Sequence, residues 1–520
     1  MGCCALIPRI TRARAWALYL PMLGAFVAAN QHPLLNYIFT VILIVCFNAF
    51  GCLLRRRGPQ APQETQDVEA LLSRAPGAPP APAAASRVAY LDAVKALLAV
   101  VVVLHHVVGA FAGGGSLGFS VGNFRNALQP VFGAVQCVAS PLFARQPQFR
   151  RGLPIHSAPP PPPAAHRTLN QAYFMSLFFF ISAYFAPGSV ARKGAKGFMR
   201  DRATRLALPF APFFFLLGPA LLFYVQWAMG TGTWAYIPYA GPLWFVVWLG
   251  VFSFFYAMVA EAGGPASFAA CELPGAGALL GLGLGLGALQ GAQMVGFSLF
   301  PLMPISWGSL PFDVCFFYAG VLAKRNGWLD DPLPRRLVLA ARAYAALFIA
   351  AVGAGFYCLH LYGGGAFLLS ANACGAGADR EGRLGAGAGI GVIMALATAS
   401  GPYTFFMSVA VLDFARQAMD GRSPAPWLKF LSEHAYAAYI FHPVAVFPAT
   451  GAFVALARAG GAPMAWTGGG ADSVSCVAAG GGSQEPTLLA GFLAAAAVSL
   501  LGTYFLVFLI RRIPGASSVL

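Results

Sequence analysis

Apolar residues gather along the chain into runs of about 20, almost free of charge, separated by basic or glycine-rich connections. A run of this length is what an α-helix needs to cross a hydrocarbon core about 30 Å thick. Ten such runs follow one another: 88–112, 171–186, 206–229, 242–262, 276–300, 306–323, 338–359, 388–418, 428–456 and 488–510. The run 388–418 is interrupted by Gly401-Pro402, so the sequence leaves open one kinked helix or a half-helix followed by a full one. The pattern predicts an all-α, polytopic membrane helix bundle with about ten core transmembrane helices.

The segments outside these runs set the expected domain boundaries. Residues 1–57 contain two further apolar stretches and predict an N-terminal membrane hairpin. Residues 58–86 are rich in Pro, Ala, Gln and Glu, a composition typical of a disordered linker. The membrane domain is therefore expected at 87–512, with a loop insertion at 113–170 and a tail at 513–520.

Glycine is concentrated in three tracts, at 263–291, 363–391 and 460–482. Their low complexity predicts loop insertions, with poor order in the last two.

The overall composition supports a membrane protein. Of 520 residues, 58% are hydrophobic and 10% charged, against roughly 25% charged in a soluble globular domain. The net charge of +16 would suggest a nucleic-acid partner in a soluble protein. Here the basic residues form short clusters between apolar runs, so we expect them to set the membrane topology and predict no nucleic-acid partner.

The basic clusters also orient the chain. Strict alternation through ten helices places these clusters on one face: 55–57, 192–205, 324–336, 416–429 and 511–512. By the positive-inside rule this face is cytoplasmic. The loops that then face outward are 113–170, 360–387 and 457–487. We expect an integral, multi-pass membrane protein, whose organelle or plasma membrane the sequence does not name.

Ionisable residues interrupt the first core run. Lys95 and His106 are eleven positions apart, about 20° beyond three full turns, so both lie on one stripe about 16 Å apart along the axis. Ionisable groups within a membrane typically mark a functional cavity, and histidine is suited to act as a general base near neutral pH. His105 points about 80° away from this stripe. Alternatively, Lys95 extends to the interface beside Asp92 and the histidines bind backbone carbonyls.

Two further motifs carry chemistry. Arg202 and Arg205 close a basic loop, and paired guanidiniums at a membrane entrance suit phosphate, although topological charge is the alternative. In the ninth run, Tyr436, Tyr439 and His442 recur at intervals of three and line one side of a helix. A polar stripe should face the bundle interior, where structural hydrogen bonding is an alternative to catalysis.

In this order, the motifs resemble the acyltransferase-3 family of membrane acyltransferases. Leu91 to His106 is similar to the family's first helix, whose signature is Arg or Lys, ten residues, then His. Later blocks that resemble the family are Phe178–Phe185, Arg202/Arg205 with Pro209, Gly241–Phe245, Phe317–Gly320 and Tyr436–His442.

The resemblance implies an acyl-CoA-type donor that acts from the cytoplasm as a co-substrate, and an acceptor hydroxyl on a carbohydrate or a lipid-linked molecule. It implies no bound cofactor or metal. By the same resemblance, His106 is the catalytic histidine, Lys95 its basic partner, and Arg202 with Arg205 the donor-binding pair. The residues that we assign to an acceptor pocket or to structural support are His105, Ser182, Trp244, Tyr436, Tyr439 and His442.

The doubled histidine and the Gly-Pro-Leu-Trp-Phe block most resemble the branch of glucan-modifying succinyltransferase-like proteins. The chain departs from the family pattern at Lys95, where Arg is commoner, and lacks after Trp244 the glutamate of the O-antigen acetylase branch. The rival hypothesis is a proton-coupled transporter or flippase that uses the Lys/His stripe. An internal repeat would favour the rival, and we find no convincing repeat between the two halves.

Overall fold

The computed structural model describes residues 83–111, 118–121, 169–229, 236, 238–263, 271–295, 309–361, 382–419, 424–460, 464–467, 473–478 and 485–520. The predicted hairpin 1–57, most of the linker 58–86 and most of the 113–170 insertion lie outside the described residues. The first described helix begins at Ala83, ahead of the predicted domain start at 87, and its opening Ala-Ala-Ala-Ser sequence is rich in the best helix former.

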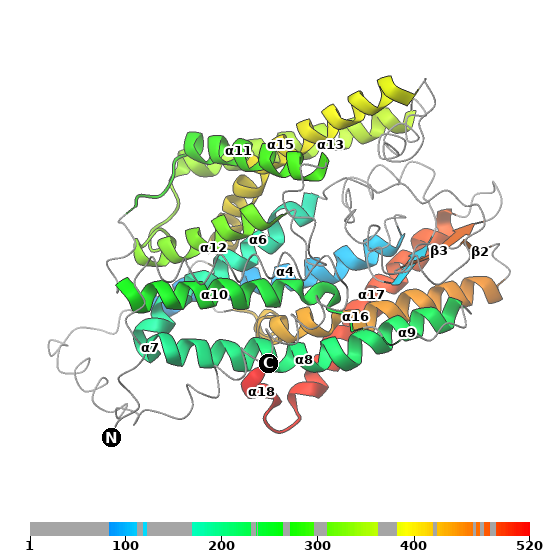
Figure 1. Ribbon diagram of the computed structural model, residues 1–520, viewed down its shortest axis with the longest axis horizontal. Coiled ribbons are helices and arrows are strands. Elements are labelled where there is room, and N and C mark those ends of the chain that lie inside the picture. The colour runs from blue at the N-terminus through cyan, green and yellow to red at the C-terminus, as the bar shows by residue number, and fades with distance from the viewer. Residues whose placement is uncertain are drawn as a thin grey trace.

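Long helices dominate the described part of the chain (Figure 1). The longer helices are α4 (Ala83–Phe111), α6 (Leu169–Tyr184), α7 (Ala186–Arg202), α9 (Gly218–Met229), α10 (Trp244–Gly263), α11 (Ala276–Val295), α12 (Leu310–Arg325), α13 (Arg335–Leu361), α15 (Gly382–Met419), α16 (Pro426–Ala459) and α17 (Glu485–Arg511). The described residues also form two short α-helices, α8 (Leu208–Pro212) and α18 (Ala516–Val519). Each of the ten predicted runs contains a helix.

Seven helical spans in the described residues are long and apolar enough to cross a membrane, and two shorter apolar helices, Ala172–Tyr184 and Ala276–Ala292, accompany them. The prediction of a helical polytopic bundle is thereby confirmed. The run 388–418 forms one continuous helix, α15, with Pro402 inside it.

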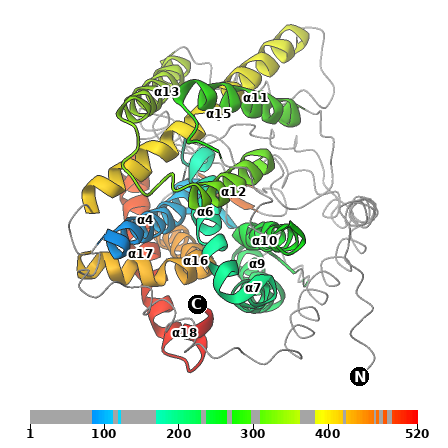
Figure 2. The same cartoon turned by 90° about the vertical axis from the view of Figure 1, so that its left-hand side faces the viewer.

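Helix α4 lies in the middle of the bundle and packs against α6, α15, α16 and α17. Figures 1 and 2 show α11, α13 and α15 together at one edge, with α10 and the α7–α9 stretch on the other side of α4 and α6. The apolar core includes close ring contacts, such as Phe179 with Phe245 at 4.4 Å between ring centroids. Helices far apart in the sequence are thus packed around α4 and α6.

The basic segment 192–205, predicted as a loop, is helical. Helix α7 contains a break at Gly194, where φ is +68°, and helical structure continues through α8 and α9 to Met229. A positive φ is favourable for glycine because it lacks a Cβ atom. The chain changes direction at this glycine and remains helical on both sides.

Residues 276–291 fall both in a predicted glycine-rich loop, 263–291, and in a predicted apolar run, 276–300; they belong to α11, so the loop prediction is wrong there and the helix prediction is confirmed. A Cβ at Gly283 would lie 2.5 Å from the Cα of Pro402, and one at Gly287 would lie 2.5 Å from the carbonyl oxygen of Ala397. Glycines four apart form one face of a helix and let two backbones approach closely. Glycine here serves helix packing between α11 and α15, a role that low complexity did not suggest.

The tract 460–482 contains two strands, which corrects its prediction as a loop; apart from Gly460, the remainder of this tract lies outside the described residues. Strand β3 (Ser473–Ala478) lies between β1 (Gly118–Val121), parallel to it, and β2 (Met464–Thr467), antiparallel to it. Ser473 pairs with Gly118, and Cys476 pairs with Trp466. The alternating Ser-Val-Ser-Cys-Val sequence is typical of a strand. Residues 382–391 of the tract at 363–391 are also helical, in α15, and its other residues lie outside the described part.

Candidate active site

His106 stacks on His442. The two ring centroids are 4.9 Å apart and the ring planes differ by 21°. His106 is half-buried on α4, whereas His442 on α16 is fully buried. Packing of α16 against α4 thus brings together two residues that the sequence analysis selected separately.

His105 faces a different neighbour. Its ring is buried and lies 5.5 Å from the ring of Phe174 on α6. Successive residues on an α-helix point about 100° apart, which explains why the two adjacent histidines contact different helices.

The tautomer of His442 follows from its neighbours. Its Nδ1 lies 2.7 Å from the carbonyl oxygen of Tyr439. This carbonyl would bond the backbone N–H four residues later in an α-helix, but that residue is Pro443, which has no N–H. Because a carbonyl can only accept, Nδ1 carries the proton and the neutral ring has a lone pair on Nε2. Nε2 is buried and has no hydrogen-bond partner among the described residues.

Tyr436 likewise binds a backbone carbonyl that precedes a proline by four residues, in another helix. Its hydroxyl donates to the carbonyl of Arg205 at 2.5 Å, and the residue four positions after Arg205 is Pro209. A π-helical turn, Ala203–Ala207, surrounds this carbonyl. Such turns often occur at functional sites.

The Tyr439 hydroxyl donates to the carbonyl of Pro242, just before α10. Both tyrosine hydroxyls therefore bind main-chain carbonyls, the structural role weighed in the sequence analysis.

Lys95 forms an ion pair with Asp92 at 2.5 Å, one turn away on α4. The Lys95 Nζ also lies 5.2 Å from the ring centroid of Phe185, immediately after α6. Both charged side chains are partly exposed, at 34% for Lys95 and 42% for Asp92. The ammonium is thus held at an accessible end of the bundle.

Arg202 reaches the same end of α6. Its guanidinium donates to the carbonyl of Ser182 at 3.0 Å, in the last turn of α6, where helix carbonyls lack intrahelical partners. Ser182 therefore contributes its carbonyl to this contact. Arg205 is exposed, and its carbonyl, rather than its guanidinium, contacts Tyr436.

Lys324 is a third cation at this position, and the sequence analysis treated it only as topological charge. Its Nζ lies 5.2 Å from the ring centroid of Tyr184, the last residue of α6. Lys95, Arg202 and Lys324 therefore contact residues 182–185 from three different helices. Positive charge is favourable there because the carboxyl end of a helix carries a partial negative charge. We refer to these three residues as the cationic collar.

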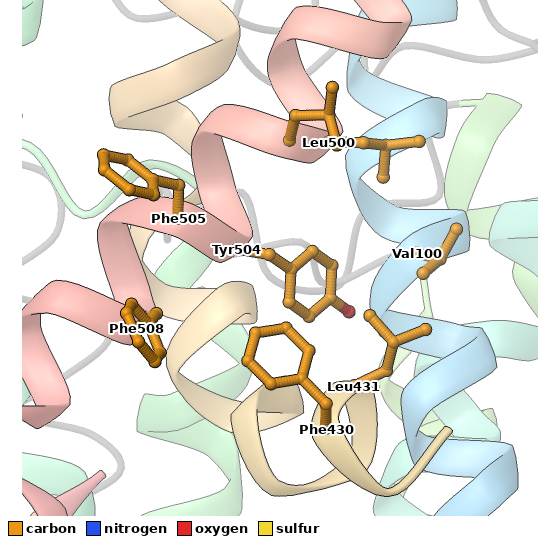
Figure 3. A pocket seen from close by; sticks show the side chains of 8 residues that line it. Val100, Phe430, Leu431, Leu500, Tyr504, Phe505 and Phe508 are labelled. Carbon is orange, nitrogen blue, oxygen red and sulfur yellow. The ribbon is translucent and has the colours of Figure 1, made fainter. Parts of the chain in front are cut away.

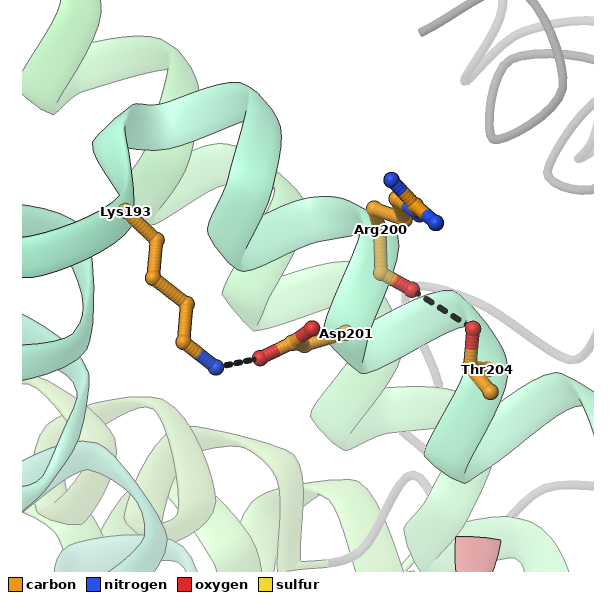
Figure 4. Close-up of polar contacts among 4 residues, drawn as sticks. All are labelled: Lys193, Arg200, Asp201 and Thr204. Atoms are coloured by element: carbon orange, nitrogen blue, oxygen red, sulfur yellow. Dashed lines mark hydrogen bonds and ion pairs between the residues drawn. The ribbon is translucent and has the colours of Figure 1, made fainter. Parts of the chain in front are cut away.

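One other basic residue of α7, Lys193, is paired within the helix. Lys193 pairs with Asp201 across the Gly194 break, and the Thr204 hydroxyl donates to the carbonyl of Arg200 at 3.0 Å (Figure 4). The pairing with Asp201 offsets the charge of Lys193, so this residue adds little to an anion site.

A buried acidic residue was not selected from the sequence. The Ser176 hydroxyl on α6 donates to Oδ1 of Asp313 on α12 at 3.0 Å, and Asp313 is fully buried. The available signal was a single carboxylate within the apolar run 306–323. Trp244, which was selected, is half-buried at the start of α10 and packs against the apolar core.

Among the described residues, no group of three His, Cys, Asp or Glu side chains could hold a metal ion. A groove of about 530 Å³ lies between α4, α16 and α17, and its lining contains none of the predicted site residues (Figure 3).

A family model for an acyltransferase domain, the acyltransferase-3 model, matches residues 88–512. The chain belongs to the acyltransferase-3 family, as the sequence motifs predicted. No curated protein and no solved structure matches the chain. Family membership and the apolar spans together identify a multi-pass membrane acyltransferase. An enzyme of this class transfers an acyl group from an acyl donor to a hydroxyl-bearing acceptor. The resemblance to the succinyltransferase-like branch stays a prediction.

Proposed function

We propose that the chain transfers an acyl group from a cytoplasmic acyl-CoA-type donor to a hydroxyl on a carbohydrate or lipid-linked acceptor. The observation that carries the proposal is the stack of His106 on His442 inside the bundle, on the helix that also bears Lys95. Placing an ionisable imidazole inside a membrane bundle costs free energy, and residues of this kind are therefore typically functional.

The cationic collar supports binding of an anionic donor. Arg202 offers a planar fork for phosphate oxygens, and Lys95 and Lys324 add two ammonium groups around the end of α6. Arg205 is exposed on the same helical stretch and serves as an outer contact. Lys95 of the collar and His106 are separated by about 16 Å along α4, which suits a donor whose phosphates lie far from its acyl carbonyl.

His106 acts as the general base. It takes the proton of the acceptor hydroxyl while the hydroxyl oxygen attacks the thioester carbonyl. The carbon–sulfur bond breaks, and the thiolate receives the proton from the imidazolium. An alternative within the same function is transient acylation of His106, followed by attack of the acceptor hydroxyl on the acyl-imidazole, which transfers the acyl group and frees the histidine.

His442 positions His106. Its Nδ1–H is held by the carbonyl that Pro443 leaves without a helical donor, so the His442 ring is fixed in orientation. The fixed ring provides a flat surface on which His106 stacks. A general base contributes about 10²- to 10⁴-fold only when it is oriented toward its proton.

The proposal is tested by incubating the purified protein with a panel of acyl-CoA donors and candidate glycan or lipid acceptors, followed by mass spectrometry. A donor-dependent mass increment on an acceptor supports it. Uptake of substrate into sealed vesicles without any increment would instead support the transporter hypothesis.

A further inference from the structure

A second candidate binding site lies away from the histidines, in the groove between α4, α16 and α17 (Figure 3). The groove has a volume of about 530 Å³. Its lining residues are Val100, Phe430, Leu431, Leu500, Leu501, Tyr504, Phe505 and Phe508. All of these side chains are apolar except for the single hydroxyl of Tyr504, so the groove suits a hydrocarbon chain.

The groove opens toward the surroundings of the bundle. Leu501 is 73% exposed and Phe505 is 64% exposed, and both lie on a helix that is apolar enough to cross a membrane. Val100 is five positions after Lys95, so it points about 140° away from it around α4. The groove therefore faces bilayer lipid and is separate from the Lys95 side of α4.

One polar group inside the groove points to a ligand. Tyr504 is 8% exposed, and its hydroxyl has no hydrogen-bond partner among the described residues. Figure 3 shows this hydroxyl directed toward the side chains of Val100 and Leu431. A buried phenol without a partner is costly, so a ligand with a hydrogen-bond acceptor at this depth would be stabilised.

Positive charge gathers at one end of the groove. The Arg512 guanidinium lies 4.3 Å from the ring centroid of Phe508, a lining residue. Nearby, Arg511 donates to the carbonyl of Glu433, and Lys429 lies 4.0 Å from the Glu433 carboxylate. Three cations thus accompany one carboxylate. Arg512 follows Tyr504 by eight positions, about 12 Å along a helix.

We propose that this groove binds one anionic glycerophospholipid from the leaflet on the basic side of the bundle. Its phosphate contacts Arg512, an ester carbonyl accepts a hydrogen bond from Tyr504, and one acyl chain runs past Leu500 and Leu501. The bound lipid fills the space between α4 and the two C-terminal helices. This site is independent of the acyl-transfer reaction.

Native mass spectrometry of the full-length purified protein tests the site, with phosphatidylglycerol and phosphatidylcholine of identical chains as probes. We expect one tightly retained phosphatidylglycerol and weaker retention of phosphatidylcholine. Arg512→Gln should weaken phosphatidylglycerol binding about fivefold, the effect of one basic residue near an anionic surface. Arg336→Gln, at an exposed position on α13, is the matched control and should bind normally.

Two variants examine the groove itself. Leu500→Trp should remove the retained lipid by filling the groove. Tyr504→Phe should weaken lipid binding without changing the shape of the groove. Equal retention of both lipids, or identical behaviour of Arg512→Gln and Arg336→Gln, would overturn the proposal in favour of a general lipid coat. Saturable displacement by acyl-CoA would also overturn it, because the groove would then be a donor site. Arg512 is exposed, so its variant should fold.

Discussion

The imidazole of His106 stacks on that of His442 at 4.9 Å, and the second ring is held by the carbonyl of Tyr439. Two helices far apart along the family domain, α4 and α16, therefore build one pair of rings. The predictions below separate the chemical part of this arrangement from its structural part.

His106→Ala should abolish acyl transfer while the protein still reaches the membrane in normal amount. Loss of a general base lowers turnover by about 10²- to 10⁴-fold. The measurement is acceptor acylation per amount of membrane protein. His105→Gln is the control, because the His105 ring packs against Phe174 on α6 whereas the ring of His106 stacks on His442, and it should retain most of the activity. Substantial transfer by the alanine variant would remove the proposed role.

A double-mutant cycle should reveal the link between His442 and Pro443. His442→Phe keeps a ring for stacking but leaves the carbonyl of Tyr439 without a donor, at a cost of about 1–3 kcal/mol. In a Pro443→Ala background the restored backbone N–H can satisfy that carbonyl, so the same substitution should cost less. Unfolding in mild detergent measures both costs. Equal costs in the two backgrounds would contradict the assigned tautomer.

Lys324→Gln should raise the KM for the acyl donor by about fivefold and leave kcat nearly unchanged, because it removes one cation from the cationic collar and touches no reacting atom. The readout is initial rate against donor concentration. Arg336→Gln removes the same charge from an exposed position on α13 and should leave both constants unchanged. A fall in kcat alone would place Lys324 outside the donor site.

Gly401→Ala should destabilise the bundle by about 1–3 kcal/mol, since its Cβ would collide with the carbonyl oxygen of Gly283 on the facing helix. Gly285→Ala is the matched control on α11, where a Cβ meets nothing within 4 Å. Alanine there should be neutral or stabilising by up to about 1 kcal/mol, because it favours helix more than glycine does. Thermal unfolding in detergent compares the two, and equal stabilities would contradict close packing of α11 on α15.

Local patterns along the chain accounted for most of the elements. Each apolar run became a helix because its residues satisfy their backbone hydrogen bonds internally and present apolar side chains to lipid. The glycine-rich composition gave a wrong loop prediction at 276–291, because the glycines of α11 are spaced for contact with α15. Pro209 and Pro443 indicate in the sequence which backbone carbonyls need a side-chain donor, since each proline lacks the N–H that would bind the carbonyl four residues earlier.

The sequence by itself determined the membrane class, the helical elements, the family, and the positions of Lys95 and His106 along one helix. Only the tertiary structure decided that His442 covers His106 and that Lys324 joins Lys95 and Arg202 at the end of α6. Helix periodicity depends on neighbours within a few residues, whereas these contacts depend on how α4, α6, α12 and α16 pack, which is set by side-chain shape across the bundle.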